Sequence, residues 1–216
     1  MITVVVGVGP GMGMAIARRF GAGGASLALV ARRAEALAAY AEELAAEGIT
    51  AQGFVADISD EASLRAAFAA IRDELGDPDV LVFNASVSVE GGPGEVSPAA
   101  AVDVLRVTAI GALVSLQEVL PAMRAADAGT VLVTGGGLAL RPWPPMTALG
   151  MGKAAVRNLV LAAARDLADT GIHVATVTIM GVVGSPGFAP PDIAERFWDL
   201  HTQPRGTWDT ELTVGT

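Results

Sequence analysis

The sequence contains no cysteine, which excludes disulfide bonds, thiolate metal sites and a cysteine nucleophile. Histidine occurs only twice, and no cluster of histidine and carboxylate residues along the chain suggests a metal site. Tyrosine and lysine occur once each, as Tyr40 and Lys153. Because every other basic side chain is an arginine, the single ammonium group of Lys153 suggests a specific task. A solvated position on a helix is the alternative interpretation.

Charge is also scarce, at 17% of residues, and it is unbalanced, with a formal net charge of -9. Nucleic acids bind basic surfaces, so we expect no nucleic-acid partner. No apolar stretch is long enough to span a membrane without a glycine, proline or charge, although the mean hydropathy is +0.50. The first residues, ITVVVGVG, follow no basic region or cleavage site. We therefore expect a cytoplasmic protein without membrane contact, whose partners are small molecules or copies of itself.

The length of 216 residues and the hydrophobic content of 52% suit one core, so we expect a single domain over residues 1–216. Short runs rich in β-branched residues alternate with longer alanine-rich segments. The expected strands are Ile2–Val6, Ala25–Val30, Thr50–Val55, Val80–Phe83, Thr130–Thr134 and His173–Ile179, and the expected helices are Met12–Phe20, Ala34–Glu47, Asp60–Leu75, Ala99–Arg124 and Met146–Asp169. Almost unbroken valine, isoleucine and leucine runs indicate strands covered on both faces. The predicted fold is therefore α/β, a doubly wound parallel sheet of the Rossmann type.

The connection between the first strand and the first helix carries the clearest motif. The segment VVVGVGPGMGMAIARRF places Gly7, Gly9, Gly11 and Gly13 there, with Met12 at the helix start. Glycine lets backbone approach a pyrophosphate, and the N-terminus of the following helix offers free N–H groups. A tight turn that binds nothing gives the same spacing. Its position after the first strand of a β-α-β unit favours a nucleotide site.

The end of the second strand indicates which nucleotide binds. An acidic residue is expected there when the ligand is NAD, but the strand is followed by Arg32 and Arg33. Two cations suit a 2′-phosphate. The alternative is that both are solvated at a helix start, where the helix dipole makes positive charge slightly unfavourable. The pattern therefore predicts NADP(H) rather than NAD(H).

Several motifs occur in a characteristic order along the chain. They are the glycines Gly7, Gly11 and Gly13, the ADIS motif around Asp57, the FNAS motif around Asn84, and Lys153 on the fifth long helix. With these motifs the chain resembles the short-chain dehydrogenase/reductase family from residue 1 to about residue 185. Each motif alone is weak evidence, but their order and spacing together indicate the fold and a cofactor site.

The resemblance implies a role for each matching position. In the family the glycine turn holds the dinucleotide diphosphate, an aspartate such as Asp57 contacts the adenine, and a segment such as Asn84 and Ala85 lies over the cofactor. Val183 is placed to meet the nicotinamide amide. The expected cofactor-binding residues are Gly7, Gly9, Gly11, Met12, Gly13, Arg32, Arg33, Asp57, Ile58, Asn84, Ala85, Ser86, Lys153, Gly181, Val183 and Ser185. Ser86 stands where the family has glycine.

The resemblance also gives Lys153 a task. The family carries a Tyr-x-x-x-Lys pair, in which the lysine binds the nicotinamide ribose and lowers the pKa of the tyrosine, the proton donor. Lys153 aligns with that lysine, but Leu149 stands in place of the tyrosine, Gly136 in place of the catalytic serine and Thr108 in place of a supporting asparagine. Tyr40 lies on another helix and cannot replace the missing phenol. Lys153 and Thr108 remain the candidate catalytic residues.

Three functions stay open at this point. The first is an NADP(H)-dependent oxidoreductase acting on a small carbonyl or alcohol substrate with a non-standard active site. The second is a non-redox enzyme, such as a cyclase, isomerase or lyase, on the same scaffold. The third is a catalytically inactive cofactor-binding or partner subunit. The expected substrate-pocket residues are Gly136, Arg141, Trp143, Leu149 and Trp198.

The C-terminal part and two of the helices carry further expectations. Residues 185–210 are expected to place a helix, Pro191–Leu200, beside the substrate, followed by a short strand at Leu212–Val214. The expected helices Ala99–Arg124 and Met146–Asp169 are apolar over a wider arc than one sheet face requires. We therefore expect a homodimer or homotetramer that uses these two helices, as the family resemblance also implies.

Overall fold

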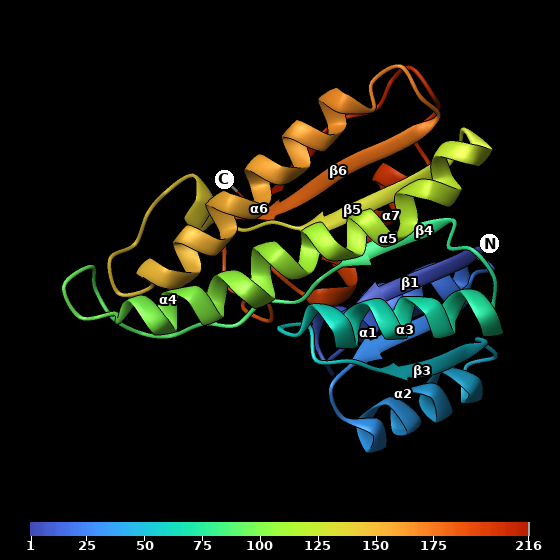
Figure 1. The fold of residues 1–216 in the computed structure, drawn as a ribbon, viewed down its shortest axis with the longest axis horizontal. Coiled ribbons are helices and arrows are strands. Elements are labelled where there is room, and N and C mark those ends of the chain that lie inside the picture. Colours follow the sequence, from blue (N-terminus) through green and yellow to red (C-terminus); the bar gives the residue numbers. More distant parts are fainter. Residues whose placement is uncertain (216) are drawn as a thin grey trace.

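The computed structural model describes residues 1–215 and contains a seven-stranded sheet in the order β3-β2-β1-β4-β5-β6-β7 (Figure 1). Each neighbouring pair of strands is parallel. The strands are β1 (Ile2–Val6), β2 (Ser26–Ala31), β3 (Ala51–Val55), β4 (Val80–Phe83), β5 (Gly129–Thr134), β6 (Ile172–Ile179) and β7 (Glu211–Val214). The prediction of a doubly wound parallel sheet of the Rossmann type is confirmed.

Helices cover both faces of this sheet. They are α1 (Met12–Ala22), α2 (Ala34–Ala46), α3 (Glu61–Glu74), α4 (Pro98–Leu105), α5 (Gly111–Ala126), α6 (Thr147–Asp166) and α7 (Pro190–His201), with a π-helical turn η1 (Arg106–Ile110) and a 3-10 turn η2 (Gly137–Ala139). In Figure 1, α3, α5 and α6 lie in front of the sheet. Buried side chains of α1, α2 and α7 form the core on the opposite face.

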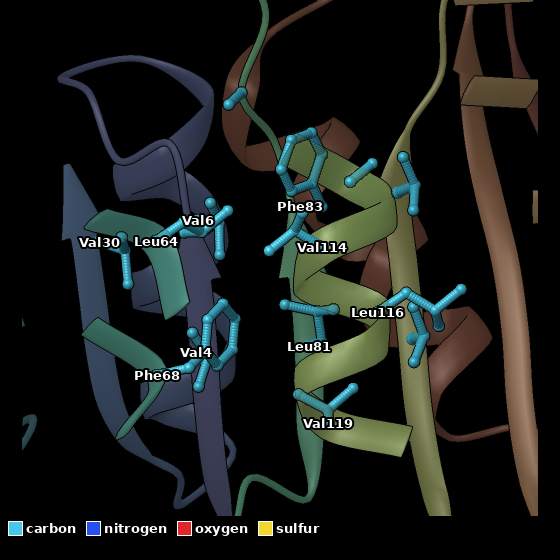
Figure 2. Close-up of a cluster of buried hydrophobic side chains, with 14 of the residues drawn as sticks. Val4, Val6, Val30, Leu64, Phe68, Leu81, Phe83, Val114, Leu116 and Val119 are labelled. Carbon is cyan, nitrogen blue, oxygen red and sulfur yellow. The ribbon is translucent and has the colours of Figure 1, made fainter. Parts of the chain in front are cut away.

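Alternating strand residues supply the two cores. Val4 and Val6 of β1 point to the face of α3 and α5, whereas Val5 between them points to the face of α1. Figure 2 shows the first core, whose labelled residues are Val4, Val6, Val30, Leu64, Phe68, Leu81, Phe83, Val114, Leu116 and Val119. Because both neighbouring faces are buried, the central strands are mostly valine, isoleucine and leucine, as the sequence pattern predicted.

Two central strands position the site. β1 pairs with β2 on one side and with β4 on the other. The strand order therefore runs outward from β1 to β3 in one direction and from β4 to β7 in the other. In such sheets the crevice for ligands lies at the carboxyl ends of the strands where the winding direction changes. The glycine turn follows β1 and the FNAS motif follows β4, so both motifs reach this crevice.

The helix expected over Ala99–Arg124 differs in one respect, because η1 interrupts it between α4 and α5. The helical run Pro98–Ala126 is also long and apolar enough to cross a membrane by length and composition alone. The run contains Gly111, Pro121 and charged residues, so it agrees with the expectation that no stretch of this length is free of glycine, proline and charge. Glu118 in this run bonds Arg65 and Arg72 of α3, a contact typical of a helix packed on its own protein.

The C-terminal segment forms the expected helix and the expected last strand, close to the predicted Pro191–Leu200 and Leu212–Val214. α7 packs against α1, where the Trp198 ring meets the Phe20 ring edge-on with 5.3 Å between centroids. The guanidinium of Arg19 lies over the same indole at 4.2 Å. α7 therefore helps to cover α1. After it, β7 adds the last strand beside β6.

Candidate active site

A cavity of about 570 Å³ lies at the carboxyl ends of the central strands. Its walls come from the glycine turn after β1, from the ends of β2 to β6, and from α6. The predicted residues that line it are Gly7, Gly9, Gly11, Met12, Gly13, Arg32, Asp57, Ile58, Asn84, Ala85, Ser86, Gly136, Leu149, Lys153, Gly181 and Val183. The fold thus brings together residues from almost the full length of the chain.

The glycines of the turn fall into two kinds. A Cβ at Gly7 would lie 2.6 Å from the backbone of Ala85, and one at Gly13 would lie 2.7 Å from Val8 Cα, so internal packing requires both glycines. A Cβ at Gly9 or Gly11 would meet nothing within 4 Å, although both residues line the cavity. The open space beside Gly9 and Gly11 is where a ligand can approach the backbone closely.

Helix α1 begins at this open turn. Its N-cap, Gly11, supplies no side-chain hydrogen bond, and no acidic residue occupies the first turn. The first backbone N–H groups of a helix have no partner within the helix, and its N-terminus carries partial positive charge. The turn is therefore suited to an anionic group such as a phosphate.

Polar residues at the ends of β2 and β3 form the far side of the cavity. Arg32 follows β2 and lines the cavity, and Arg33 lies next to it in a smaller adjoining hollow. Asp57, after β3, accepts hydrogen bonds from Ser59 N at 2.9 Å and Ser59 Oγ at 2.7 Å. These bonds, with a smaller contribution from the charge of Arg32, lower the pKa of the Asp57 carboxyl. A cation and an anion thus face the same end of the cavity.

Hydrogen bonds connect the ends of three strands to α6. Asn84 Nδ2 donates to Gly7 O at 3.0 Å, and Asn84 Oδ1 accepts from Thr134 Oγ1 at 2.9 Å. Lys153 Nζ donates to Thr134 O at 2.8 Å. This hydrogen-bonded row, Gly7, Asn84, Thr134 and Lys153, crosses the cavity wall from β1 to β4, β5 and α6. It fixes the lysine relative to the glycine turn.

Lys153 is buried, with 7% of its surface exposed. Burial lowers the pKa of its ammonium group to about 8. No carboxylate among residues 1–215 forms an ion pair with it, and its one hydrogen-bond partner in that part of the chain is a backbone carbonyl. A buried cation without a counter-ion is unfavourable, so its retention favours a ligand-directed role.

Gly136 and Leu149 lie beside this lysine in the cavity wall. A Cβ at Gly136 would lie 3.4 Å from the side-chain carbons of Lys153, an ordinary contact, and the backbone there is extended at φ -169°. The neighbouring Gly135 differs, because a Cβ there would lie 2.6 Å from Thr176 Oγ1. Packing therefore requires glycine at Gly135 and leaves room for a side chain at Gly136.

Comparison with known proteins decides the family. A family model described as short chain dehydrogenase matches residues 1–189. The chain belongs to the short-chain dehydrogenase family. The chain is 36% identical over 200 residues to a Streptomyces violaceoruber protein described as "Granaticin polyketide synthase putative ketoacyl reductase 1"; the match covers 90% of this chain and 70% of that protein.

Two solved structures are similar to the chain over nearly its whole length. A metagenomic short-chain oxidoreductase in complex with NADP has a TM-score of 0.92 and 29% identity, and the match covers 99% of this chain and 96% of that one. An alcohol dehydrogenase from the archaeon Thermococcus sibiricus, complexed with 5-hydroxy-NADP, has a TM-score of 0.88 and 25% identity, with 98% and 94% covered.

Some predicted site residues of the chain lie outside the cavity. Arg141 and Trp143 are exposed on the loop before α6. Ser185 bonds the carbonyl of Val182 at 2.6 Å instead of lining the cavity. Trp198 of α7 packs on Phe20 of α1 and does not line the cavity. These assignments depended on the path of loops, which hydrophobic periodicity does not define.

Thr108 also differs from its expected role. It lies in η1 with 1% of its surface exposed, and its hydroxyl has no hydrogen-bond partner among residues 1–215. A Cβ at Gly152 of α6 would lie 3.2 Å from the Thr108 side chain, so the two helical segments are in close contact there. Its neighbour Val107 lines the cavity instead. Thr108 is therefore placed to pack, not to touch a substrate.

The sequence did not single out several residues of the wall. They are Val8, Ala31, Ser59, Val87, Val107, Gly135, Gly137, Leu138 and Ile179. Most are small or apolar and carry no chemical signal in the sequence. Thr134 also lines the cavity, and from the sequence it is a recognisable candidate for the pocket border, because its hydroxyl lies at the carboxyl end of a central strand. Its part in the hydrogen-bonded row depends on three-dimensional contacts.

Proposed function

We propose that this chain binds NADP(H) and acts as an oxidoreductase on a small carbonyl or alcohol substrate, with a non-standard active site. The hydrogen-bonded row from Gly7 to Lys153 carries this proposal, because it connects the glycine turn to the single lysine along the wall of the cavity. The names of the relatives support the reaction class: a ketoacyl reductase and an alcohol dehydrogenase.

The cavity fits a dinucleotide. Gly9 and Gly11 leave open space for a diphosphate at the N-terminus of α1. Arg32 faces the end of the cavity where the second strand ends, and no acid follows that strand to bind a ribose 2′-hydroxyl. Arg33 lies close enough to share a 2′-phosphate through the adjoining hollow. Solved relatives with bound NADP and 5-hydroxy-NADP support the same choice.

The catalytic end departs from the usual family pattern. Lys153 is suited to bind ribose hydroxyls, while Leu149 and Gly136 stand where the family has the tyrosine and the serine. When bound, the reduced nicotinamide supplies a hydride to a carbonyl carbon. Val87, Val107 and Leu138 add apolar surface to the cavity wall. The proton for the carbonyl oxygen must then come from a group other than tyrosine.

One experiment separates this function from its alternatives. The purified protein is titrated with NADPH by calorimetry and then mixed with a panel of aldehydes and ketones while NADPH absorbance is followed. Binding with oxidation is the expected result. Binding of NADPH without its oxidation by any substrate favours a non-redox enzyme or an inactive partner subunit. The observation that supports these alternatives is that no tyrosine lines the cavity among the described residues. A protein that binds no NADPH contradicts the proposal.

We also propose a homodimer or homotetramer built on α4, η1, α5 and α6. Large apolar side chains are exposed on these elements, with 45% of Val102, 48% of Ile110 and 47% of Met151 accessible. α4 and η1 both pack against α6, so the three residues lie on one connected part of the molecule. A second copy with the same face would bury them.

A further inference from the structure

The cavity offers few groups that can give a proton to a substrate. Among residues 1–215, the polar side chains that line it are Arg32, Asp57, Ser59, Asn84, Ser86, Thr134 and Lys153. The single tyrosine, Tyr40, lies on α2 and packs against the core on the α1 face. The proton donor for a carbonyl reduction must therefore come from this short set or from water.

Position and chemistry exclude most of them. Arg32, Asp57 and Ser59 follow β2 and β3, which lie on the other side of β1 from β4, β5 and the α6 end of the cavity. Asn84 and Thr134 bond each other, and neither an amide nor an aliphatic hydroxyl gives up a proton readily at neutral pH. The hydroxyl of Ser86 has the same weakness.

Lys153 alone combines position with a transferable proton. An ammonium group has three N–H donors. Among the described residues, Lys153 uses one of them, in its hydrogen bond to Thr134 O. Gly136 places no side chain over the lysine stem, and Leu149, one turn earlier on α6, adds only an apolar surface. The remaining N–H groups are available to a ligand in the cavity.

We propose that the ammonium group of Lys153 itself donates the proton to the carbonyl oxygen of the substrate, in place of the missing phenol. This inference rests on the proposed function. The carbonyl carbon accepts a hydride, with its two electrons, from the reduced nicotinamide, and the π electrons of the C=O bond move to oxygen. That oxygen bonds one Nζ proton as the N–H bond breaks, which leaves a neutral amine. Water returns a proton to the amine after the alcohol leaves.

The acidity of Lys153 supports this role. Burial is the cause that lowers its pKa to about 8, close to the pH at which an acid catalyst works best. The other ionisable groups nearby form ion pairs with one another. Arg157, one turn after Lys153 on α6, pairs with Glu211, and Arg106 of η1 pairs with Asp103 of α4. Asp57 and Arg32 lie at the opposite end of the cavity. Reduction should therefore slow as pH rises through the pKa of Lys153.

Because the chain has one lysine, its titration can be observed directly. Protein grown with lysine labelled at Cε and Nζ gives a single side-chain NMR signal, whose shift is followed against pH in the presence of saturating NADPH and without a carbonyl substrate. The same protein preparation, also with saturating NADPH, gives the pH profile of kcat/KM for the carbonyl substrate. We expect the alkaline limit of kcat/KM to coincide with the pKa of the lysine, with about a tenfold loss of rate per pH unit above it.

A matched pair of variants then moves the pKa of the lysine without removing it. Leu149→Glu places a carboxylate four residues before Lys153 on α6, where opposite charges attract and raise the pKa of the lysine. Leu149→Gln is the neutral control of the same size. We expect the NMR titration and the alkaline limit of kcat/KM to move upward together in Leu149→Glu and to stay near the wild-type values in Leu149→Gln.

The outcomes separate this proposal from the function on which it rests. An alkaline limit that differs from the lysine titration in the wild type, or stays fixed when that titration moves, shows that another group donates the proton while the oxidoreductase function stands. Failure of the wild type to bind NADPH, or to oxidise it with any carbonyl, overturns both. If Leu149→Glu does not fold, the wild-type comparison still decides.

Discussion

At the scale of single residues, the site could be predicted wherever a residue directly follows a strand. The glycine turn, Arg32, Asp57 and Asn84 all follow predicted strand ends, and all line the cavity. Their chemistry is also visible in the sequence as glycine, cation, acid and amide. The burial of Lys153 could not be predicted, because it depends on how α6 packs against β6 and η1.

The first residue-scale prediction concerns Lys153 and the cofactor. Lys153→Ala removes hydrogen bonds from an ammonium group, which contribute about 1.5–3 kcal/mol each, so the Kd for NADPH should rise by about 10- to 150-fold. Lys153→Arg should also weaken binding, since a planar guanidinium does not fit the position of a compact ammonium. Calorimetric titration measures both.

Arg196→Ala, which removes an exposed cation of α7, is the control for this measurement and should bind NADPH as the wild type does. Wild-type affinity in Lys153→Ala would mean that the lysine does not touch the dinucleotide.

The second prediction tests the choice between the two dinucleotides. Replacing Arg32 and Arg33 together with alanine should weaken NADPH binding by about 1.5–3 kcal/mol for each charge-assisted hydrogen bond removed, and should leave NADH binding almost unchanged. Arg32→Ala alone should account for the larger share, because Arg32 lines the main cavity. Titrations with both dinucleotides provide the measurement. Equal reductions in affinity for NADPH and NADH would show that these arginines do not bind the 2′-phosphate.

The third prediction restores the missing hydroxyl groups. Gly136→Ser combined with Leu149→Tyr should raise carbonyl reduction, since a positioned acid contributes about 10²–10⁴-fold over its absence. The extended backbone and the open contact at Gly136 accept the serine without strain. Initial rates of NADPH oxidation compare the variant with its parent. If the parent is as fast as the variant, Lys153 already serves as well as a phenol would.

At the scale of elements, strands were easier to predict than helix interruptions. β1, β4 and β6 are short runs rich in valine and isoleucine, so their positions follow from composition. The π-helical turn η1 has the sequence RVTAI, in which no proline or glycine marks a change of helix type. Its contact with Gly152 of α6 is tertiary and is not encoded in local sequence. The docking of α7 on α1 could not be predicted for the same reason.

One element-scale prediction concerns the contact between the C-terminal segment and the sheet. Burial lowers the pKa of both His173 and His201. His173 stacks on Trp208 and bonds Asp209 O, while His201 bonds Thr130 Oγ1. A histidine whose pKa is lower in the folded state than in the unfolded state binds a proton less readily when the protein is folded. Protonation therefore favours the unfolded state, and this destabilising effect is absent at high pH, where the histidines are neutral in both states. Stability should therefore fall as pH drops below about 6.5, the ordinary pKa of histidine.

Urea unfolding of the wild type and of a His173→Gln, His201→Gln variant between pH 8 and pH 5 provides the measurement. The fall in unfolding free energy between these pH values should be smaller in the variant. An identical pH dependence in both proteins would exclude the two histidines as its source.

At the scale of the whole molecule, the parallel sheet and its crevice follow from the alternation of strands and helices, whereas the oligomer does not. We expect a dimer or tetramer in solution at micromolar concentration. Ile110→Glu should shift it toward the monomer, because it places a charge on the exposed apolar part of η1. Val55→Glu, on the edge strand β3, is the matched control, as Val55 is also exposed. Light scattering that shows a wild-type monomer would contradict this expectation.

The most direct test of the account is the equilibrium binding of the two nicotinamide dinucleotides to the unmodified protein. We predict saturable binding of one NADPH per chain and clearly weaker binding of NADH, because the cavity combines an open glycine turn with Arg32 in place of a ribose-binding acid. Calorimetric titration of one protein preparation with both ligands provides the comparison. No binding of NADPH, or equal affinity for NADPH and NADH, would contradict the account.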